Sequence, residues 1–300
     1  MQTTAIILVI LSAFIHPQWN LLSKRGQATA AFFLVSTLAV LPFAIGLVVT
    51  NRVLLSDLPP AAWGLVALTG CAQALYYSGL AAAYRHGDLS LAYPLVRALP
   101  VLMVAGASLL LGRGQMISFL GLGGFGLIAT GCFLQPLSRF ADWHPRLYLT
   151  PCCGFAVLAA LGTTGYTLID DAALRLLGEK TGAGSVQISL LYIGMLSIST
   201  AVVMSLVVGA SATGRTQCRD LLKRGWPTAA GAGIAIAFTY GLVVLAMNFA
   251  RDVSYIMAFR QLSIPIGAIL GVLVLGESVP TPRRWGIVLI VAGLILTALY

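Results

Sequence analysis

Ten long apolar runs make up most of this sequence, and nearly all of them exceed the roughly 17 residues that a helix needs to cross about 30 Å of hydrocarbon. Eight runs carry no charged residue, and the other two carry one arginine each. The runs are Met1–Ser23, Gly26–Asn51, Leu58–Tyr84, Leu89–Gly112, Gly114–Ser138, Leu147–Ile169, Thr181–Gly214, Gly225–Ala250, Val253–Gly276 and Trp285–Tyr300. Continuous runs of this length are typical of helices rather than of a barrel. The sequence therefore predicts an all-α integral membrane protein with ten transmembrane helices.

Composition agrees with this class and argues against nucleic acid as a partner. Only 9% of the 300 residues are charged, against about 25% in a soluble domain. The net charge of +9 comes from 18 Lys and Arg that lie in ones and twos between the runs, as loop charges do. The five Cys show no metal-ligand spacing, so we expect neither a metal nor a cofactor.

The stretch Tyr76–Gly112 occurs a second time, 164 residues further on. Asp88 is matched by Asp252, and Arg97 is answered by Arg260 one position out of register. The repeat divides the chain into two five-helix halves, residues 1–138 and 147–300, joined by a polar connector at 139–146. Five is odd, so the halves must enter the membrane in opposite directions. Such inverted repeats are typical of secondary transporters with a site near the midplane.

A second glycine pattern needs a different interpretation. The segment Gly121-Leu-Gly123-Gly124-Phe-Gly126 matches G-x-G-x-x-G, but it lies inside an apolar run and follows no strand, which argues against dinucleotide binding. Small residues in such a run favour close packing of helices.

With its five-plus-five spans, the sequence resembles the EamA family of the drug/metabolite transporter superfamily. The motifs that carry the resemblance are SLAYPLVRALPVLMVAGASLLLG in the fourth run and Leu275-Gly276-Glu277 at the end of the ninth. The resemblance covers the whole chain and implies two EamA repeats that move small metabolites across the inner membrane. One departure is Arg113, which stands in the first copy where the second has Glu277.

The first run carries a polar stripe made of His16, Trp19, Asn20 and Lys24, at i, i+3, i+4 and i+8 of a helix. We expect His16, Trp19 and Asn20 to line a central cavity, where His16 would titrate. The alternative is a helix-end anchor at the interface.

The sixth run is the counterpart of the first, with Thr163, Tyr166, Thr167 and Asp170 on one face. We include Thr163 and Tyr166 among the substrate-binding candidates. For Asp170 and Asp171 two interpretations stay open, a cap in water or a part of the site.

The buried arginines are the strongest pointer to a site, because a charge at mid-span costs about 2.5–3.5 kcal/mol on insertion scales. Arg97 and Arg260 lie nine and eight residues into their runs, which is roughly 12 Å deep by helical rise. Either each is tied to carbonyls freed by Pro100 or Pro265, or both form a donor fork for a carboxylate or phosphate. We expect no acidic residue at mid-span. The remaining candidates beside the arginines are Tyr93, Tyr255 and Gln261.

These features favour a secondary transporter of a small polar or anionic metabolite, with H⁺ or another ion as a candidate coupling ion. The alternative is a lipid-phosphate flippase or another lipid-handling membrane protein. We find no Walker sequence and no convincing nucleophile or acid/base pair, so we do not expect an enzyme. The expected setting is the lipid bilayer of the inner membrane, as a monomer or homodimer.

Two features of the sequence give opposite orientations in the membrane. Loops after odd-numbered spans hold eleven Lys and Arg, and those after even-numbered spans hold five. The positive-inside rule then places both termini outside, whereas the family resemblance implies that both lie inside. The two termini share a side in either case, because ten is even.

Overall fold

The computed structural model describes residues 3–26, 28–110, 119–249, 256 and 260–298, which form eleven α-helices and three short 3₁₀ helices. The helices of the first half are α1 Thr3–Arg25, α2 Ala30–Thr50, α3 Pro60–His86, α4 Leu89–Leu110 and α5 Phe119–Leu134, with the 3₁₀ helix η1 Arg52–Asp57. The later helices are η3 Phe140–Asp142, η4 Pro145–Leu149, α6 Pro151–Thr181, α7 Ser185–Gly209, α8 Ala212–Arg224, α9 Trp226–Met247, α11 Ser263–Leu275 and α12 Thr281–Ala298.

Helix starts and stops follow local sequence chemistry. Thr29 and Thr150 cap α2 and α6, because each hydroxyl accepts a hydrogen bond from a main-chain N–H in the first turn. At the other end, α6 and α11 stop at Gly182 and Gly276, whose φ angles of 59° and 68° lie in the left-handed region. Both ends are therefore specified by residues that suit a cap.

Within the part of the chain that the structure describes, six helices are long and apolar enough to cross a membrane, namely α1, α2, α3, α6, α7 and α9. Shorter apolar helices cover Leu89–Val104, Leu120–Leu134 and Ser263–Leu275. Large apolar side chains face outward along them: Phe43 is 66% exposed, Leu206 69% and Leu273 77%. Soluble proteins rarely expose such surfaces. The architecture is that of an α-helical membrane protein.

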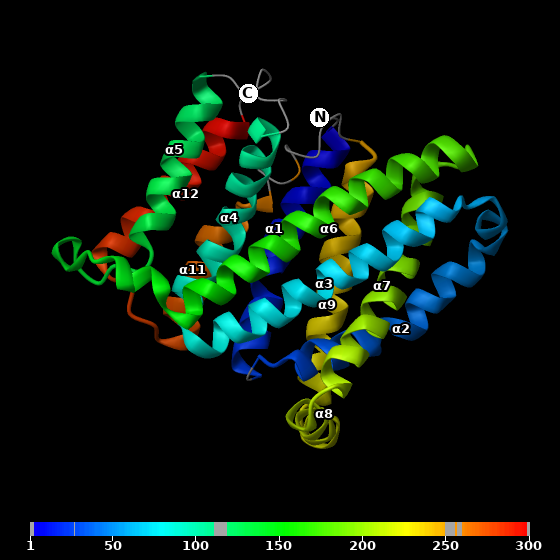
Figure 1. The fold of residues 1–300 in the computed structure, drawn as a ribbon, viewed down its shortest axis with the longest axis horizontal. Coiled ribbons are helices and arrows are strands. Elements are labelled where there is room, and N and C mark those ends of the chain that lie inside the picture. The colour runs from blue at the N-terminus through cyan, green and yellow to red at the C-terminus, as the bar shows by residue number, and fades with distance from the viewer. Residues whose placement is uncertain (1–2, 27, 111–118, 250–255, 257–259, 299–300) are drawn as a thin grey trace.

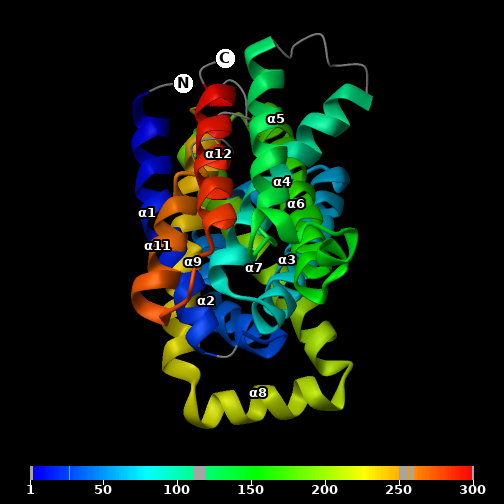
Figure 2. The ribbon, with the colours of Figure 1, turned by 90° about the vertical axis from the view of Figure 1, so that its left-hand side faces the viewer.

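Packing joins the first half of the chain to the second throughout the bundle. Helix α3 lies along α6, and α1 lies along α9. Helix α2 packs on α7 and α9, α4 packs on α6 and α11, and α5 packs on α12, a pair that Figures 1 and 2 both show side by side. The helices α1, α4, α6, α9 and α11 therefore bring distant parts of the sequence to one centre.

The α5–α12 pair approaches closely through glycines. A Cβ at Gly131 would lie 2.6 Å from the carbonyl oxygen of Gly286, and one at Gly293 would lie 2.5 Å from that of Gly124. In the sequence, the match between the two halves continues past Gly112 and aligns Gly124 with Gly286 and Gly131 with Gly293. The glycine-rich segment of α5 thus serves helix packing, as its sequence indicated.

Helix α8 differs from the others because it has no buried residue and carries Arg215, Arg219, Lys223 and Arg224. Figure 2 shows it lying across the end of the bundle that is opposite to both termini. It joins α7 to α9 outside the apolar bundle.

Candidate functional site

Buried polar atoms without hydrogen-bond partners gather at the centre of the bundle. Among the described residues, nine buried side-chain nitrogen or oxygen atoms lack a partner. Eight of the nine belong to a set that we call the central cluster: His16, Trp19, Tyr93, Arg97, Arg260, Gln261 and Ser263. Each unpaired buried group costs about 1–3 kcal/mol, so this concentration is a candidate binding site.

Arg97, from α4, is one of the two guanidinium groups at the centre. Its Nη2 donates to the main-chain carbonyl of Arg260 at 2.9 Å, while its Nε has no partner. The Arg260 carbonyl precedes the first turn of α11, where the N–H of Ile264 donates instead to Gln261 at 2.8 Å. Arg97 is therefore tied in part to a backbone carbonyl, but not to one that Pro100 or Pro265 frees, because the missing N–H groups of those prolines would have paired with Val96 and Gln261.

Arg260 has more free donors than Arg97. Its guanidinium carbon lies 5.6 Å from the centre of the Tyr240 ring, within cation–π range. Tyr166 lies close enough to the same guanidinium to interact with it electrostatically. The Nε and Nη2 atoms of Arg260 have no partner among the described residues, so a fork of two donors is available here.

The polar stripe of α1 reaches the same centre. The His16 ring packs edge-on against Trp19 with 4.8 Å between ring centroids, and His16 lies close enough to both arginines to interact electrostatically. Nε2 of His16 and Nε1 of Trp19 are unpaired. Asn20 is instead occupied, because its amide donates to the His16 carbonyl and its oxygen accepts from Tyr84.

Among the other candidates from the sequence, some carry an unpaired polar atom and others do not. Tyr93 is buried beside Ser263, and Gln261 is buried next to Arg260 in the chain, with one unpaired atom in each. Thr163 is buried on α6, and its carbonyl accepts from Thr167. Tyr255 lies outside the described residues.

Asp170 corrects the expectation that mid-span acidic residues are absent. Its side chain on α6 is 0% exposed, and its carboxylate accepts hydrogen bonds at 2.5 Å from Thr69 of α3 and Tyr192 of α7, and a third from Tyr240 of α9. A cap in water is therefore excluded for Asp170. Its neighbour Asp171 does reach the surface, where it pairs with Arg175.

Tyr240 connects this carboxylate to the central cluster. Its hydroxyl donates to Asp170 while the face of its ring lies against the Arg260 guanidinium. Tyr166 adds to the contact, since its ring meets the Tyr240 ring edge-on at 5.4 Å and it lies close to Arg260. The carboxylate and the guanidinium thus share Tyr240, and Tyr166 packs beside this shared residue.

A pocket enclosed by α2, α3, α7 and α9 opens beside Tyr240. It holds about 470 Å³ of empty space, including its mouth. Its lining is mixed polar and apolar, and the polar members are Ser36, Thr37, Gln73, Tyr77, Ser197, Thr200 and Tyr240. Neither arginine lines it. Tyr240 is therefore the residue through which this pocket meets the buried charges.

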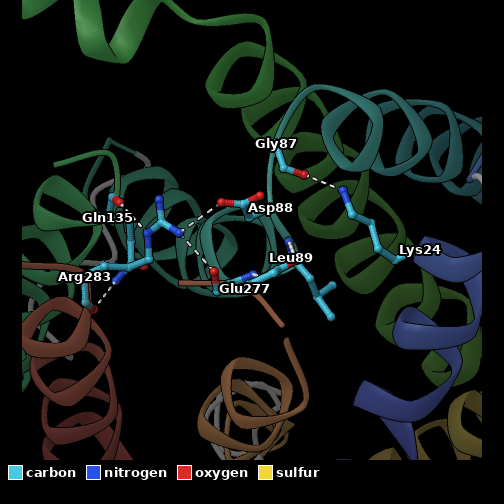
Figure 3. A network of polar contacts seen from close by, with 8 residues as sticks. Lys24, Gly87, Asp88, Leu89, Gln135, Glu277 and Arg283 are labelled. Atoms are coloured by element: carbon cyan, nitrogen blue, oxygen red, sulfur yellow. Dashed lines mark hydrogen bonds and ion pairs between the residues drawn. The ribbon is translucent and has the colours of Figure 1, made fainter. Parts of the chain in front are cut away.

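A second polar network joins helix ends and loops, and Figure 3 shows it from close by. We call it the loop network, and it comprises Lys24, Asp88, Gln135, Glu277 and Arg283. The Glu277 carboxylate accepts from the main-chain N–H groups of Leu89 and Ser90 at 2.7 and 2.8 Å. It therefore caps the N-terminus of α4, where a negative charge is favoured.

Two basic residues complete the loop network. Arg283 donates to Ser90 at 2.9 Å, to the Gln135 carbonyl at 3.2 Å and to Asp88 at 3.5 Å. Lys24, at the end of α1, donates to the carbonyls of Tyr84 and Gly87. These contacts tie the end of α1 to the end of α3, and the start of α4 and the end of α5 to the α11–α12 loop and the first turn of α12.

Comparison with known proteins bears on the fold alone. No protein-family model and no curated protein matches the chain. Twenty-one solved chains match it in structure. One, described only as the crystal structure of a protein, has a TM-score of 0.61 and 16% sequence identity, with 100% of this chain and 98% of that chain covered. The complete length of the bundle is thus a known fold, which by itself assigns no function.

Proposed function

We propose that the protein is a secondary transporter that moves a small polar or anionic metabolite across the inner membrane by alternating access. The observation that carries the proposal is the central cluster of buried polar atoms without partners. Four of the eight atoms can only donate: the indole N–H of Trp19, Nε of Arg97, and Nε and Nη2 of Arg260. A ligand with carboxylate or phosphate oxygens would supply the missing acceptors.

The helix pairing supports the ten-span inverted repeat that this proposal assumes. If residues 147–300 repeat residues 1–138, the α3–α6 contact corresponds to α1–α9, and α4–α6 corresponds to α1–α11, and all four contacts are present. The glycine contacts follow the same rule. Gly124 corresponds to Gly286 and Gly131 to Gly293, and the contacts run crosswise, from Gly131 to Gly286 and from Gly124 to Gly293. Crosswise contacts of this kind are what a two-fold axis between the copies produces. Together with the fourth- and ninth-run motifs, they support an EamA-type transporter.

The proposal is tested first by binding. Purified protein is screened by thermal shift against phosphate, pyruvate, malate and glutamate, and any stabilising anion is then tested for uptake into proteoliposomes. Arg260→Lys should weaken the response, and Arg146→Lys, a change at an exposed connector residue, should not. If none of these anions binds and labelled lipid turns over instead, the protein is a lipid-handling protein rather than a metabolite transporter.

The span count needs a separate test. Reporters that are active on one side of the membrane only are fused to the N-terminus and after Tyr300. Ten spans require both fusions to report the same side, whichever side that is. Opposite sides would contradict the ten-helix arrangement.

A further inference from the structure

We propose that Asp170 is a proton-binding site that couples proton movement to the anion held at Arg260. This inference rests on the proposed transport function, because it identifies the coupling ion of that transporter. The observation behind it is a carboxylate that is 0% exposed and yet forms no salt bridge among the described residues. Its negative charge is held only by hydroxyl donors from three other helices.

The contacts of Asp170 suit a proton better than a metal ion. Three hydroxyl groups occupy the two carboxylate oxygens, with Thr69 and Tyr192 both on Oδ1 and Tyr240 on Oδ2. Hard metal ions take about six or more oxygen ligands, and the described residues hold no group of three or more acidic, His or Cys side chains. A proton needs only one carboxylate oxygen.

The charged and titratable groups that face Asp170 are few. Tyr192 approaches from α7, Tyr240 from α9 and Arg260 from the segment before α11, while Tyr166 lies on α6 itself. From α3 the facing group is the Thr69 hydroxyl, which does not titrate. Arg260 is the only cation of this set, and the Tyr240 ring stands between it and the carboxylate.

Protonation must change the hydrogen bonds of Asp170. The ionised carboxylate accepts from all three hydroxyls, whereas the neutral acid has an O–H that donates. One hydroxyl must then turn from donor to acceptor. Of the three hydroxyl partners, Tyr240 is the one that lines the pocket, and Asp170 itself does not line it. The proton is taken from water in this pocket onto a carboxylate oxygen and is later released to water, and no other bond is made or broken.

The same step changes the field at Arg260. While Asp170 is ionised, its charge offsets part of the Arg260 charge, and when Asp170 is neutral the guanidinium attracts an anion more strongly. Protonation therefore favours anion binding, and by linkage anion binding favours protonation. The two ligands would move together in one direction, as in symport.

The first experiment uses protons alone as the probe. Infrared difference spectra of the reconstituted protein are recorded between pH 5 and pH 9, and the protonated-carboxyl C=O band is followed. We expect a titrating band that disappears in Asp170→Asn, remains in the matched control Asp171→Asn, and shifts in Tyr240→Phe, which keeps the carboxyl but removes one donor. A band that is identical in wild type and Asp170→Asn would overturn the inference.

The second experiment follows coupling with the stabilising anion of the four tested above. Wild-type affinity should fall roughly five-fold or more between pH 5.5 and pH 8, within the usual range of coupling, and Asp170→Asn should bind equally well at both. Wild-type transport without any response to pH, or driven by Na⁺ instead, would refute proton coupling. If none of the four anions binds, the proposed function fails while the infrared result still decides whether Asp170 takes up a proton.

Discussion

The guanidinium of Arg97 donates to the main-chain carbonyl of Arg260 at 2.9 Å, so one buried arginine holds the chain segment that carries the other. The two residues occupy nearly equivalent places in the repeat, yet their contacts differ. One guanidinium nitrogen of Arg97 donates to the backbone. Two guanidinium nitrogens of Arg260 have no partner among the described residues, and this guanidinium lies against the Tyr240 ring. In the proposed transporter, Arg97 would therefore both position the segment before α11 and bind the anion, whereas Arg260 would bind the anion.

Arg260→Lys should weaken anion binding without a large loss of stability. Lysine keeps the positive charge but loses the planar fork that matches two acceptor oxygens. The expected loss of binding free energy is roughly 1–3 kcal/mol, the cost of one charged hydrogen bond. The measurement is a titration with the anion that stabilises the wild type, combined with a melting curve of the free protein. Equal affinity in wild type and variant would remove Arg260 from the binding site.

Arg97→Lys should lower both the stability and the anion affinity. A lysine ammonium is a compact donor on a different stem, so the bond to the Arg260 carbonyl is lost or displaced. The buried carbonyl then lacks its donor, which costs about 1–3 kcal/mol of folding free energy. Melting curves of the free proteins separate this variant from Arg260→Lys. If both variants melt like the wild type, the Arg97–Arg260 bond contributes nothing to the fold.

Glu277→Gln should loosen the loop network at this end of the bundle. The Glu277 carboxylate caps α4 from the α11–α12 loop, and loss of its charge should cost about 1 kcal/mol. Cys152 of α6 can report on this end, because its thiol is buried and packs against Gly87, which precedes α4. We expect faster maleimide labelling of Cys152 in Glu277→Gln, in a background where the other four cysteines are serine.

The matched control for this labelling is Glu179→Gln, which changes an exposed carboxylate near the end of α6. It should label at the wild-type rate. Equal labelling rates for Glu277→Gln and the control would mean that the Glu277 carboxylate does not hold the loop network together.

The fold class and the buried arginines could be predicted from the sequence because both follow from local patterns. Uninterrupted apolar runs require membrane helices, and Arg97 stands inside such a run whatever its partners are. The partners themselves could not be predicted. That Arg97 meets the Arg260 carbonyl depends on how α4 and α11 cross, and their contact residues are 163 positions apart.

Asp170 shows the limit of sequence analysis most clearly. It follows Thr163, Tyr166 and Thr167 on one face of α6, so its helix face was predictable. The apolar run ends at Ile169, which indicated that the next residue, Asp170, lies in water. The α-helix nevertheless continues past Asp170 to Thr181. Its donors come from α3, α7 and α9, and no local pattern shows that three hydroxyl groups converge on one carboxylate.

The glycines of the α5–α12 contact give the last prediction. Gly131→Ala places a Cβ 2.6 Å from the Gly286 carbonyl oxygen, closer than packing allows, so the helices must separate. Overpacking of this kind costs typically about 1–3 kcal/mol. Gly286→Ala should do the same from the other side, because its Cβ would lie 2.7 Å from the Gly131 carbonyl oxygen.

Gly126→Ala is the matched control on α5, with nothing within 4 Å of its Cβ, and a helical alanine there should be neutral or stabilising. Melting curves in detergent measure all three variants. If Gly131→Ala were as stable as Gly126→Ala, the close approach of α5 and α12 would not hold this part of the bundle together, and the crosswise glycine contacts would no longer support the inverted repeat.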